Sequence, residues 1–334
     1  MDNVLNEKYK SIISFFEEAS EEVCHDYNFK VIMDVLPDDI LNAQVYKDNL
    51  QSDVYHIELY SRCLNLSYLI ETITKKFDSN DLLFFEDVRK IDLFGKMEAS
   101  TLREELNNVF ATTILTHIFF HECGHIMAGH IELKSFFYSE YDSKKVGSYY
   151  DQEKEMVADW LSTKYILKSI YKIFSGEDEH HPSPEEIVRS IRKVIVLFWV
   201  SLAIEFQIFD ACHIKSSTEN SKRTHPHPSV RLFYNLEAVF EGVNDLLLAH
   251  GLDEDSAEKG TNLIVSDVYT IIQSFIGIME VPLYNDLMKN ETVDYYMKLR
   301  DVPFEEEWYD DYLHLAQLSP NYRKIVDQYR KHLR

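Results

Sequence analysis

Apolar residues recur at intervals of three and four along most of the chain, which is the spacing of one face of an α-helix. Only 9 glycines and 8 prolines interrupt the chain, and this scarcity favours long helices. The pattern predicts long helices from near Thr101 to His130, from Asp151 to about Phe174, from Pro184 to about Cys212 and from Ser229 to about His250. Shorter helices are predicted over residues 1–24 and 65–77.

Residues 29–61 follow a different pattern. Three short segments, FKVIMDV, ILNAQVY and DVYHIELY, are rich in β-branched and aromatic residues and are separated by polar turns. They predict three strands of a small antiparallel β-sheet. The predicted fold class is therefore mainly α (α+β), with the sheet placed before the helix that begins near Thr101.

The predicted elements divide the chain into three parts. Residues 1–100 hold the N-terminal helix and the antiparallel sheet, residues 101–250 form a helical core, and residues 251–334 form a helical C-terminal extension. With 334 residues, of which 45% are hydrophobic, the chain is long enough to bury a substantial core.

The charge of the chain excludes some classes of partner. There are 34 basic and 57 acidic residues, a formal net charge of −23, which would repel nucleic acid and anionic lipid.

The longest apolar stretch, from Val194 to Phe209, is too short to span a membrane and contains Glu205. The first thirty residues show no signal peptide, and the four cysteines form no CxxC pair. We therefore expect a cytoplasmic protein with free thiols and no membrane or nucleic-acid partner.

The sequence HECGH, residues 121–125, changes this general description. Residues four apart lie on one face of a helix, so His121 and His125 could both offer a nitrogen to one metal ion. Zinc in hydrolytic sites takes three protein ligands and keeps a fourth position for water. Glu122, beside the first histidine, could receive the proton of that water as general base. The motif thus predicts one Zn²⁺ ion in the core formed by residues 101–250.

The alternative is that His121 and His125 are hydrogen-bonded core histidines, and the third ligand is the test. In EKEMVAD, Glu155 and Asp159 are one helical turn apart. We expect Glu155 to be the third ligand and Asp159 to accept the free N–H of a ligand imidazole. Glu153 is the competing ligand, but the residue four positions after it, Val157, cannot accept a hydrogen bond through its side chain.

Three residues in or near the motif are expected to have structural roles. His117, one turn before His121, is predicted to be a neutral core histidine rather than a further ligand. His130 is predicted to mark the end of the helix, where a cation is favourable. Cys123 should point away from the metal and pack in the core.

HECGH, the EMVAD of residues 155–159 and the later THPHPSVRL together resemble the gluzincin metallopeptidases of the HtpX and CAAX-protease type, whose motifs are HExxH, ExxxD and THPxxxxR. The resemblance implies a zincin-like core in which His225 stabilises the oxyanion of the reaction intermediate. It also places Arg231 near the helix of Glu155 and Asp159, where it could pair with a carboxylate. A surface position for Arg231 is the alternative.

The lack of membrane-spanning segments points to the soluble, Lit-like phage-exclusion branch of these peptidases. That resemblance covers about residues 53–240 and implies zinc-dependent cleavage of a translation elongation factor during phage infection. The expected function is therefore that of a zinc endopeptidase acting on a protein. Two alternatives stay open: a regulatory or antitoxin-like metal-binding protein that does not cleave its partner, and a general quality-control protease. The sequence predicts no oligomeric state.

Overall fold

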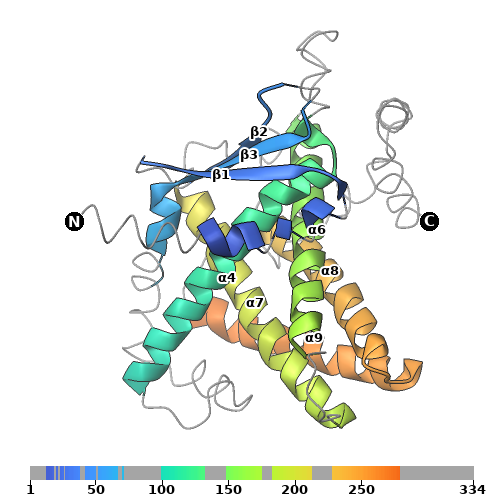
Figure 1. Cartoon of the computed structure of the whole chain (residues 1–334). Coiled ribbons are helices and arrows are strands. Elements are labelled where there is room, and N and C mark those ends of the chain that lie inside the picture. Colours follow the sequence, from blue (N-terminus) through green and yellow to red (C-terminus); the bar gives the residue numbers. More distant parts are fainter. Residues whose placement is uncertain are drawn as a thin grey trace.

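A computed structural model describes much of the chain. The described residues are 13–37, with gaps at 19, 22 and 26, then 42–49, 52–66, 70, 99–131, 148–174, 183–212 and 228–278. Within these ranges the protein is mostly helical and has one three-stranded sheet, which lies across one end of the helices (Figure 1). The predicted class, mainly α with a small sheet, is confirmed for this part of the chain.

The sheet is mixed, so the prediction of an antiparallel sheet is wrong. Its strands are β1 (Lys30–Leu36), β2 (Ala43–Tyr46) and β3 (Val54–Tyr60), in the order β1-β3-β2. The short β2 pairs with β3 in antiparallel fashion, whereas β1 pairs with β3 in parallel. Successive strands run in opposite directions, so β1 and β3 run in the same direction. Strand β1 lies on the side of β3 that faces away from β2, and the two strands therefore pair in parallel. Turn residues mark where strands end, but they do not say which neighbour a strand takes.

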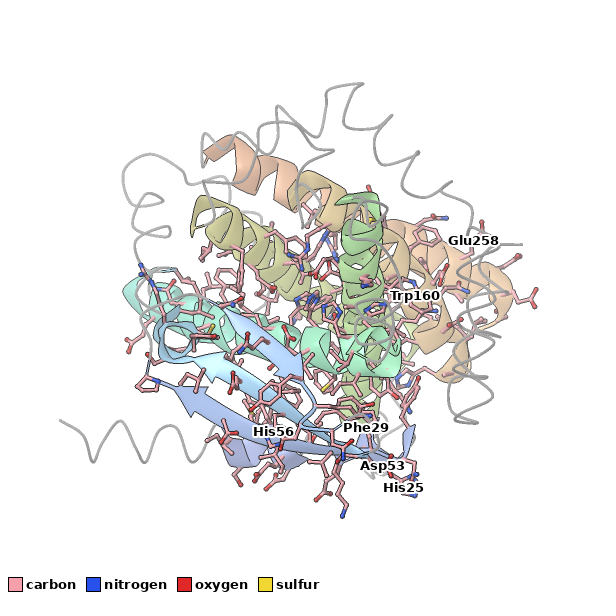
Figure 2. The ribbon with its side chains drawn as sticks, turned by 90° about the horizontal axis from the view of Figure 1, so that it is seen from above. His25, Phe29, Asp53, His56, Trp160 and Glu258 are labelled. Carbon is pink, nitrogen blue, oxygen red and sulfur yellow. The ribbon has the colours of Figure 1, made fainter. Side chains whose placement is uncertain are left out.

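One face of the sheet packs on the helices. Along β3, Tyr55, Ile57 and Leu59 are buried while the residues between them are partly exposed. This alternation is the period of two that a strand with one buried face requires. Strands β2 and β3 contact α4 (Ala99–Met127), and the view from above shows the strands lying over that helix (Figure 2). The sheet thus covers the helix that carries HECGH.

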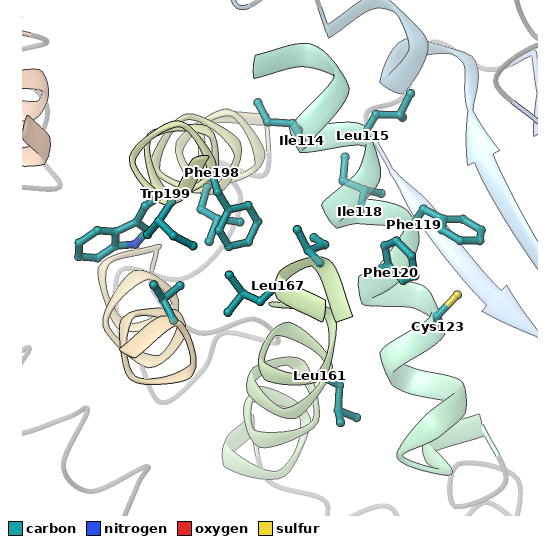
Figure 3. Close-up of a cluster of buried hydrophobic side chains, with 14 of the residues drawn as sticks. Ile114, Leu115, Ile118, Phe119, Phe120, Cys123, Leu161, Leu167, Phe198 and Trp199 are labelled. Carbon is teal, nitrogen blue, oxygen red and sulfur yellow. The ribbon is translucent and has the colours of Figure 1, made fainter. Parts of the chain in front are cut away.

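Four further long helices complete the described core. They are α6 (Ser148–Phe174), α7 (Pro184–Cys212), α8 (Pro228–Ala249) and α9 (Glu254–Ile278). Helix α4 packs against α6 and α7, α6 packs against α8, and α9 packs against α7 and α8. Between them lies a continuous apolar cluster (Figure 3), which includes Ile114, Ile118, Phe119, Leu161, Leu167, Phe198 and Trp199.

The helix boundaries follow local signals where the sequence supplies them. Pro184 begins α7, as predicted, and Ser183 caps it: the backbone N–H of Glu186 donates to the Ser183 hydroxyl over 3.3 Å, and the Glu186 carboxylate accepts from the Ser183 N–H over 2.8 Å. Helices α4 and α6 begin two and three residues earlier than expected, at Ala99 and Ser148.

Several expectations lie outside the described residues. These are most of the helix predicted over residues 65–77, the first turns of the N-terminal helix and the chain beyond residue 278. Among the helices that are described, none is both long and apolar enough to cross a membrane. The apolar stretch from Val194 to Phe209 belongs to the buried part of α7.

Candidate metal centre

Helices α4 and α6 cross with almost no space between them at Gly124. A Cβ atom at this position would lie 2.6 Å from the carbonyl oxygen of Ala158 and 2.8 Å from its Cα. Only glycine permits so close an approach of two backbones. The crossing brings His121 and His125 of α4 next to Glu155 of α6.

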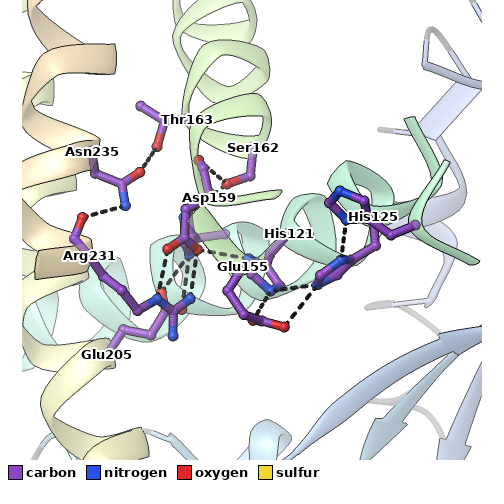
Figure 4. A network of polar contacts seen from close by, with 11 residues as sticks. His121, His125, Glu155, Asp159, Ser162, Thr163, Glu205, Arg231 and Asn235 are labelled. Atoms are coloured by element: carbon purple, nitrogen blue, oxygen red, sulfur yellow. Dashed lines mark hydrogen bonds and ion pairs between the residues drawn. The ribbon is translucent and has the colours of Figure 1, made fainter. Parts of the chain in front are cut away.

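The three predicted ligands meet at one point (Figure 4). His121 Nε2 lies 3.2 Å from His125 Nε2 and 3.2 Å from Glu155 Oε2, and His125 Nε2 lies 3.6 Å from Glu155 Oε1. Zinc bonds of 2.0–2.1 Å in a tetrahedral site imply ligand atoms about 3.3–3.4 Å apart. The spacing of the three side chains therefore matches one face of a tetrahedron around a metal ion. The side chain of Glu153 lies outside the described part of the chain.

Behind His121, two side chains form a fixed chain of contacts. His121 Nδ1 lies 2.8 Å from Asp159 Oδ1, which is the contact expected of Asp159. Arg231 of α8 donates to both oxygens of Asp159, from Nε over 2.7 Å and from a terminal nitrogen over 2.6 Å. The guanidinium also lies over the ring of Phe206, 4.2 Å from its centroid. Arg231 is only 8% exposed, so the surface alternative for this residue is wrong.

These contacts set the charges of the metal-free site. Burial would raise the pKa of Asp159, but Arg231 and then His121 hold it well below its usual value. Burial would lower the pKa of His121, but Asp159 and Glu155 outweigh burial and raise it to about 10. His121 is therefore a positively charged imidazolium between two carboxylates. Its Nε2 proton, on the side of Glu155, lies where a metal cation would bind. Burial lowers the pKa of His125 to about 3, so this imidazole is neutral and keeps one unprotonated ring nitrogen.

Glu122 is positioned differently from the ligands. It is buried beside His121 on α4, and this burial, together with Glu155, raises its pKa to about 7 against the opposing effects of His121 and Arg231. A carboxylate with a pKa near neutrality can both accept and return a proton at physiological pH. Cys123, the next residue, is fully buried in the apolar core, as predicted.

His130 has a contact that the sequence did not indicate. Its Nδ1 lies 2.8 Å from Nδ1 of His125, and the residue is buried. Burial, and then His125, lower the pKa of His130 well below its ordinary value, so the prediction of a cation at the helix end is wrong. Gly129, with φ of 70°, turns the chain back at this point. The sequence did contain a signal for this contact: His130 lies five residues after the suspected ligand His125, and a glycine, Gly129, directly precedes it.

A second polar cluster lies next to this site. His117 Nδ1 lies 3.0 Å from Oε1 and 2.9 Å from Oε2 of Glu205 on α7, and His117 Nε2 lies 3.0 Å from the hydroxyl of Ser162 on α6. The order Ser-His-carboxylate is that of a nucleophilic triad. However, Ser162 and His117 have no exposed surface, and the Ser162 hydroxyl donates to the Asp159 carbonyl over 2.7 Å. The cluster therefore links α4, α6 and α7 and confirms His117 as a core histidine.

Of the predicted site residues, the structure brings together His121, Glu122, His125, Glu155, Asp159 and Arg231. His225 lies outside the described residues, and its role stays a prediction. Sequence reasoning missed His130, Glu205 and Ser162. For Glu205, the signal was a carboxylate in the middle of the longest apolar stretch, because a carboxylate in such a stretch requires a buried partner.

Comparison of the sequence with protein-family models and with curated proteins, and of the structure with solved structures, finds no match. The likeness to gluzincin peptidases therefore rests on the three sequence motifs. Beside it stands one finding from the structure: His121, His125 and Glu155 form a group whose ligand atoms all lie within 4.8 Å of one another and could hold a metal ion.

Proposed function

We propose that this protein is a zinc-dependent endopeptidase that cleaves a cytoplasmic protein. The observation that carries the proposal is the convergence of two imidazole nitrogens and one carboxylate at 3.2–3.6 Å, with the carboxylate of Glu122 one residue from the first ligand. Two histidines, one glutamate and an adjacent glutamate base are the set used by zinc peptidases.

The donor set fits zinc for two reasons. Imidazole nitrogen and carboxylate oxygen are ordinary zinc ligands, and three of them leave a fourth position for water. In addition, the buried pair of Asp159 and Arg231 holds His121 with Nδ1 toward the carboxylate and Nε2 toward Glu155 and His125. A ligand that is oriented in this way does not have to be ordered when the metal binds.

The reaction follows from the roles of the side chains. When bound, Zn²⁺ would act as a Lewis acid that polarises the peptide carbonyl and lowers the pKa of water. Glu122 accepts one proton from water as the water oxygen forms its bond to the carbonyl carbon. Glu122 then returns this proton to the nitrogen of the leaving amine as the C–N bond breaks, so the carboxylate ends ionised, as it began. His225 is proposed to donate a hydrogen bond to the oxyanion that forms between these two steps.

The proposed substrate comes from the sequence resemblance. The resemblance to the soluble, Lit-like branch suggests a translation elongation factor, cleaved during phage infection. A chain with a net charge of −23 would favour substrates with a basic surface.

A single experiment tests the proposed function. Wild-type protein and the Glu122→Gln variant are expressed in bacterial cells, and new protein N-termini are mapped in both cultures. Glutamine preserves the size of the side chain but cannot accept the proton. We expect a small set of cuts with the wild type and none with the variant, at equal zinc content.

The pattern of cuts also separates the alternatives. Equal cutting by both proteins would contradict the role of Glu122. Zinc binding without any cut, in cells that are also infected with phage, would favour a metal-binding regulator. Broad cleavage of many unfolded chains would favour a quality-control protease.

A further inference from the structure

His130 lies at the end of the helix that carries both histidine ligands. Helix α4 ends at Met127, and its last turn is closed by bonds from the Ala128 N–H to the Gly124 carbonyl over 2.9 Å and from the Gly129 N–H to the Ile126 carbonyl over 3.0 Å. Gly129 then adopts φ of 70°, which is readily accessible only to glycine. This turn directs the buried side chain of His130 back to His125, with Nδ1 of the two rings 2.8 Å apart.

The position of the metal ligands determines the protons of this contact. His125 turns Nε2 toward His121 Nε2, at 3.2 Å, and toward Glu155. A metal held by His125 therefore uses Nε2, and the neutral ring keeps its single proton on Nδ1. Since Nδ1 of His125 then donates, Nδ1 of His130 must accept. His130 thus carries its own proton on Nε2.

We propose that His130 is a positioning residue for the metal ligand His125: it accepts the Nδ1 proton of that ligand and fixes its tautomer and ring orientation. This assignment rests on the proposed metal centre, but it goes beyond the proposed reaction and beyond the residues of the three motifs. Groups that accept the free N–H of a ligand histidine commonly change metal affinity 10–100-fold when they are removed.

The two histidine ligands are then held by acceptors of different charge. His121 donates to the carboxylate of Asp159, which Arg231 neutralises, whereas His125 donates to an uncharged imidazole. A neutral acceptor orients the ligand without adding negative charge next to the metal. A cation bound at the centre would therefore keep more of its power to polarise a carbonyl.

Matched variants test this role through metal affinity, which does not depend on peptidase activity. In His130→Asn, the side-chain oxygen is placed two bonds from Cβ, as Nδ1 is in histidine, so an acceptor is kept. In His130→Leu, a side chain of similar size lacks one. His250→Leu is the control, because His250 also lies just beyond a helix and beside a glycine with positive φ, Gly251, but this helix is α8.

Zinc affinity is measured by competition with a chelator, and the Co²⁺-substituted proteins are compared by their visible spectra. We expect His130→Leu to bind zinc 10–100-fold more weakly with a shifted Co²⁺ spectrum, and His130→Asn and His250→Leu to stay within about threefold of the wild type. Unchanged affinity in His130→Leu would overturn the assignment. An equal loss in His130→Asn would do so too, since it would point to packing alone.

A measurement on the zinc-loaded wild type does not depend on whether the variants fold. Histidine-selective ¹⁵N NMR distinguishes protonated from unprotonated ring nitrogens. We expect His130 to be protonated at Nε2 and not at Nδ1, and the reverse would overturn the assignment. If zinc binds as expected but no protein is cut, the proposed reaction fails while the role of His130 stands. If the wild type binds no metal, both fail.

Discussion

The carboxylate of Asp159 contacts two partners at once, the imidazole of His121 and the guanidinium of Arg231. Because all three side chains are buried, water cannot replace a contact that is lost. The carboxylate therefore orients a metal ligand only as long as Arg231 compensates its charge. At the scale of single residues, the integrity of the centre depends on this pair.

Replacing Arg231 by methionine should destabilise the protein strongly. Asp159 would keep only the protonated imidazole of His121 as a cationic partner, and removing one partner of a buried charge typically costs up to about 3–5 kcal/mol. Chemical denaturation of the metal-free protein measures the free energy of unfolding. Arg192→Met is the control: it removes an ion pair of 2.5 Å with Asp267 that is partly exposed, and its cost should be clearly smaller. Equal losses in the two variants would contradict the special role of Asp159.

The ionisation of Glu122 predicts how cleavage depends on pH. Burial raises its pKa from 4.5 to about 7 in the metal-free site. Only the ionised carboxylate accepts a proton, so activity is present above the pKa and is lost as pH falls through it. A bound cation favours the ionised form, and the acid limb of kcat/KM should therefore lie between 4.5 and about 7. The measurement is a pH profile at saturating zinc, and a rate that is constant across this window would contradict the role of Glu122.

At the scale of elements, the parts of the site that follow from local spacing could be predicted from the sequence. His121 and His125 lie one turn apart on any helix, and so do Glu155 and Asp159. Contacts between distant segments could not be derived in this way. The parallel pairing of β1 with β3 and the contact of His117 with Glu205 depend on how the elements pack. His130 was misjudged because its direction is set by the backbone of Gly129.

The crossing of α4 and α6 makes Gly124 sensitive to a single methyl group. In Gly124→Ala the new Cβ would meet the Ala158 backbone at 2.6 Å, and backbone cannot move aside as a side chain can. The helices must separate, which should cost about 1–3 kcal/mol and move Glu155 away from the two histidines. We expect zinc affinity to fall at least tenfold.

Gly242→Ala on α8 is the matched control for this substitution. Its Cβ would also meet α6, but at the end of the flexible Leu167 side chain, which can rotate. Zinc affinity should stay near that of the wild type. If Gly124→Ala also kept full affinity, the close crossing would not be what places Glu155.

At the scale of the whole molecule, the candidate metal centre joins elements that are far apart in sequence. Its proposed ligands come from α4 and α6. The contacts behind them reach α8 through Arg231, and α7 through the Phe206 ring that the guanidinium covers. The sheet covers the same α4 helix. A metal bound at this crossing should therefore stabilise the native state as a unit, because the unfolded chain does not bring the three ligands together.

Removal of the metal should lower the thermal stability of the protein. A ligand at one hundred times its dissociation constant adds about 2.7 kcal/mol to the native state. With an unfolding entropy of about 2.1 cal/mol/K per residue, this corresponds to a shift of roughly 4 °C in Tm for a chain of 334 residues. Calorimetry before and after treatment with EDTA measures the shift, and added zinc should reverse it. In Glu155→Ala the shift should be far smaller, and a full shift in that variant would place the metal elsewhere.

His121, His125 and Glu155, whose ligand atoms converge at the crossing of α4 and α6, are proposed to bind one zinc ion together. X-ray absorption spectroscopy of the protein loaded with one equivalent of zinc tests it most directly. We expect only nitrogen and oxygen neighbours at about 2.0–2.2 Å from the zinc, with the outer-shell scattering of two imidazoles. A sulfur neighbour at about 2.3 Å, which would indicate a cysteine ligand, or a shell without imidazole scattering would contradict it.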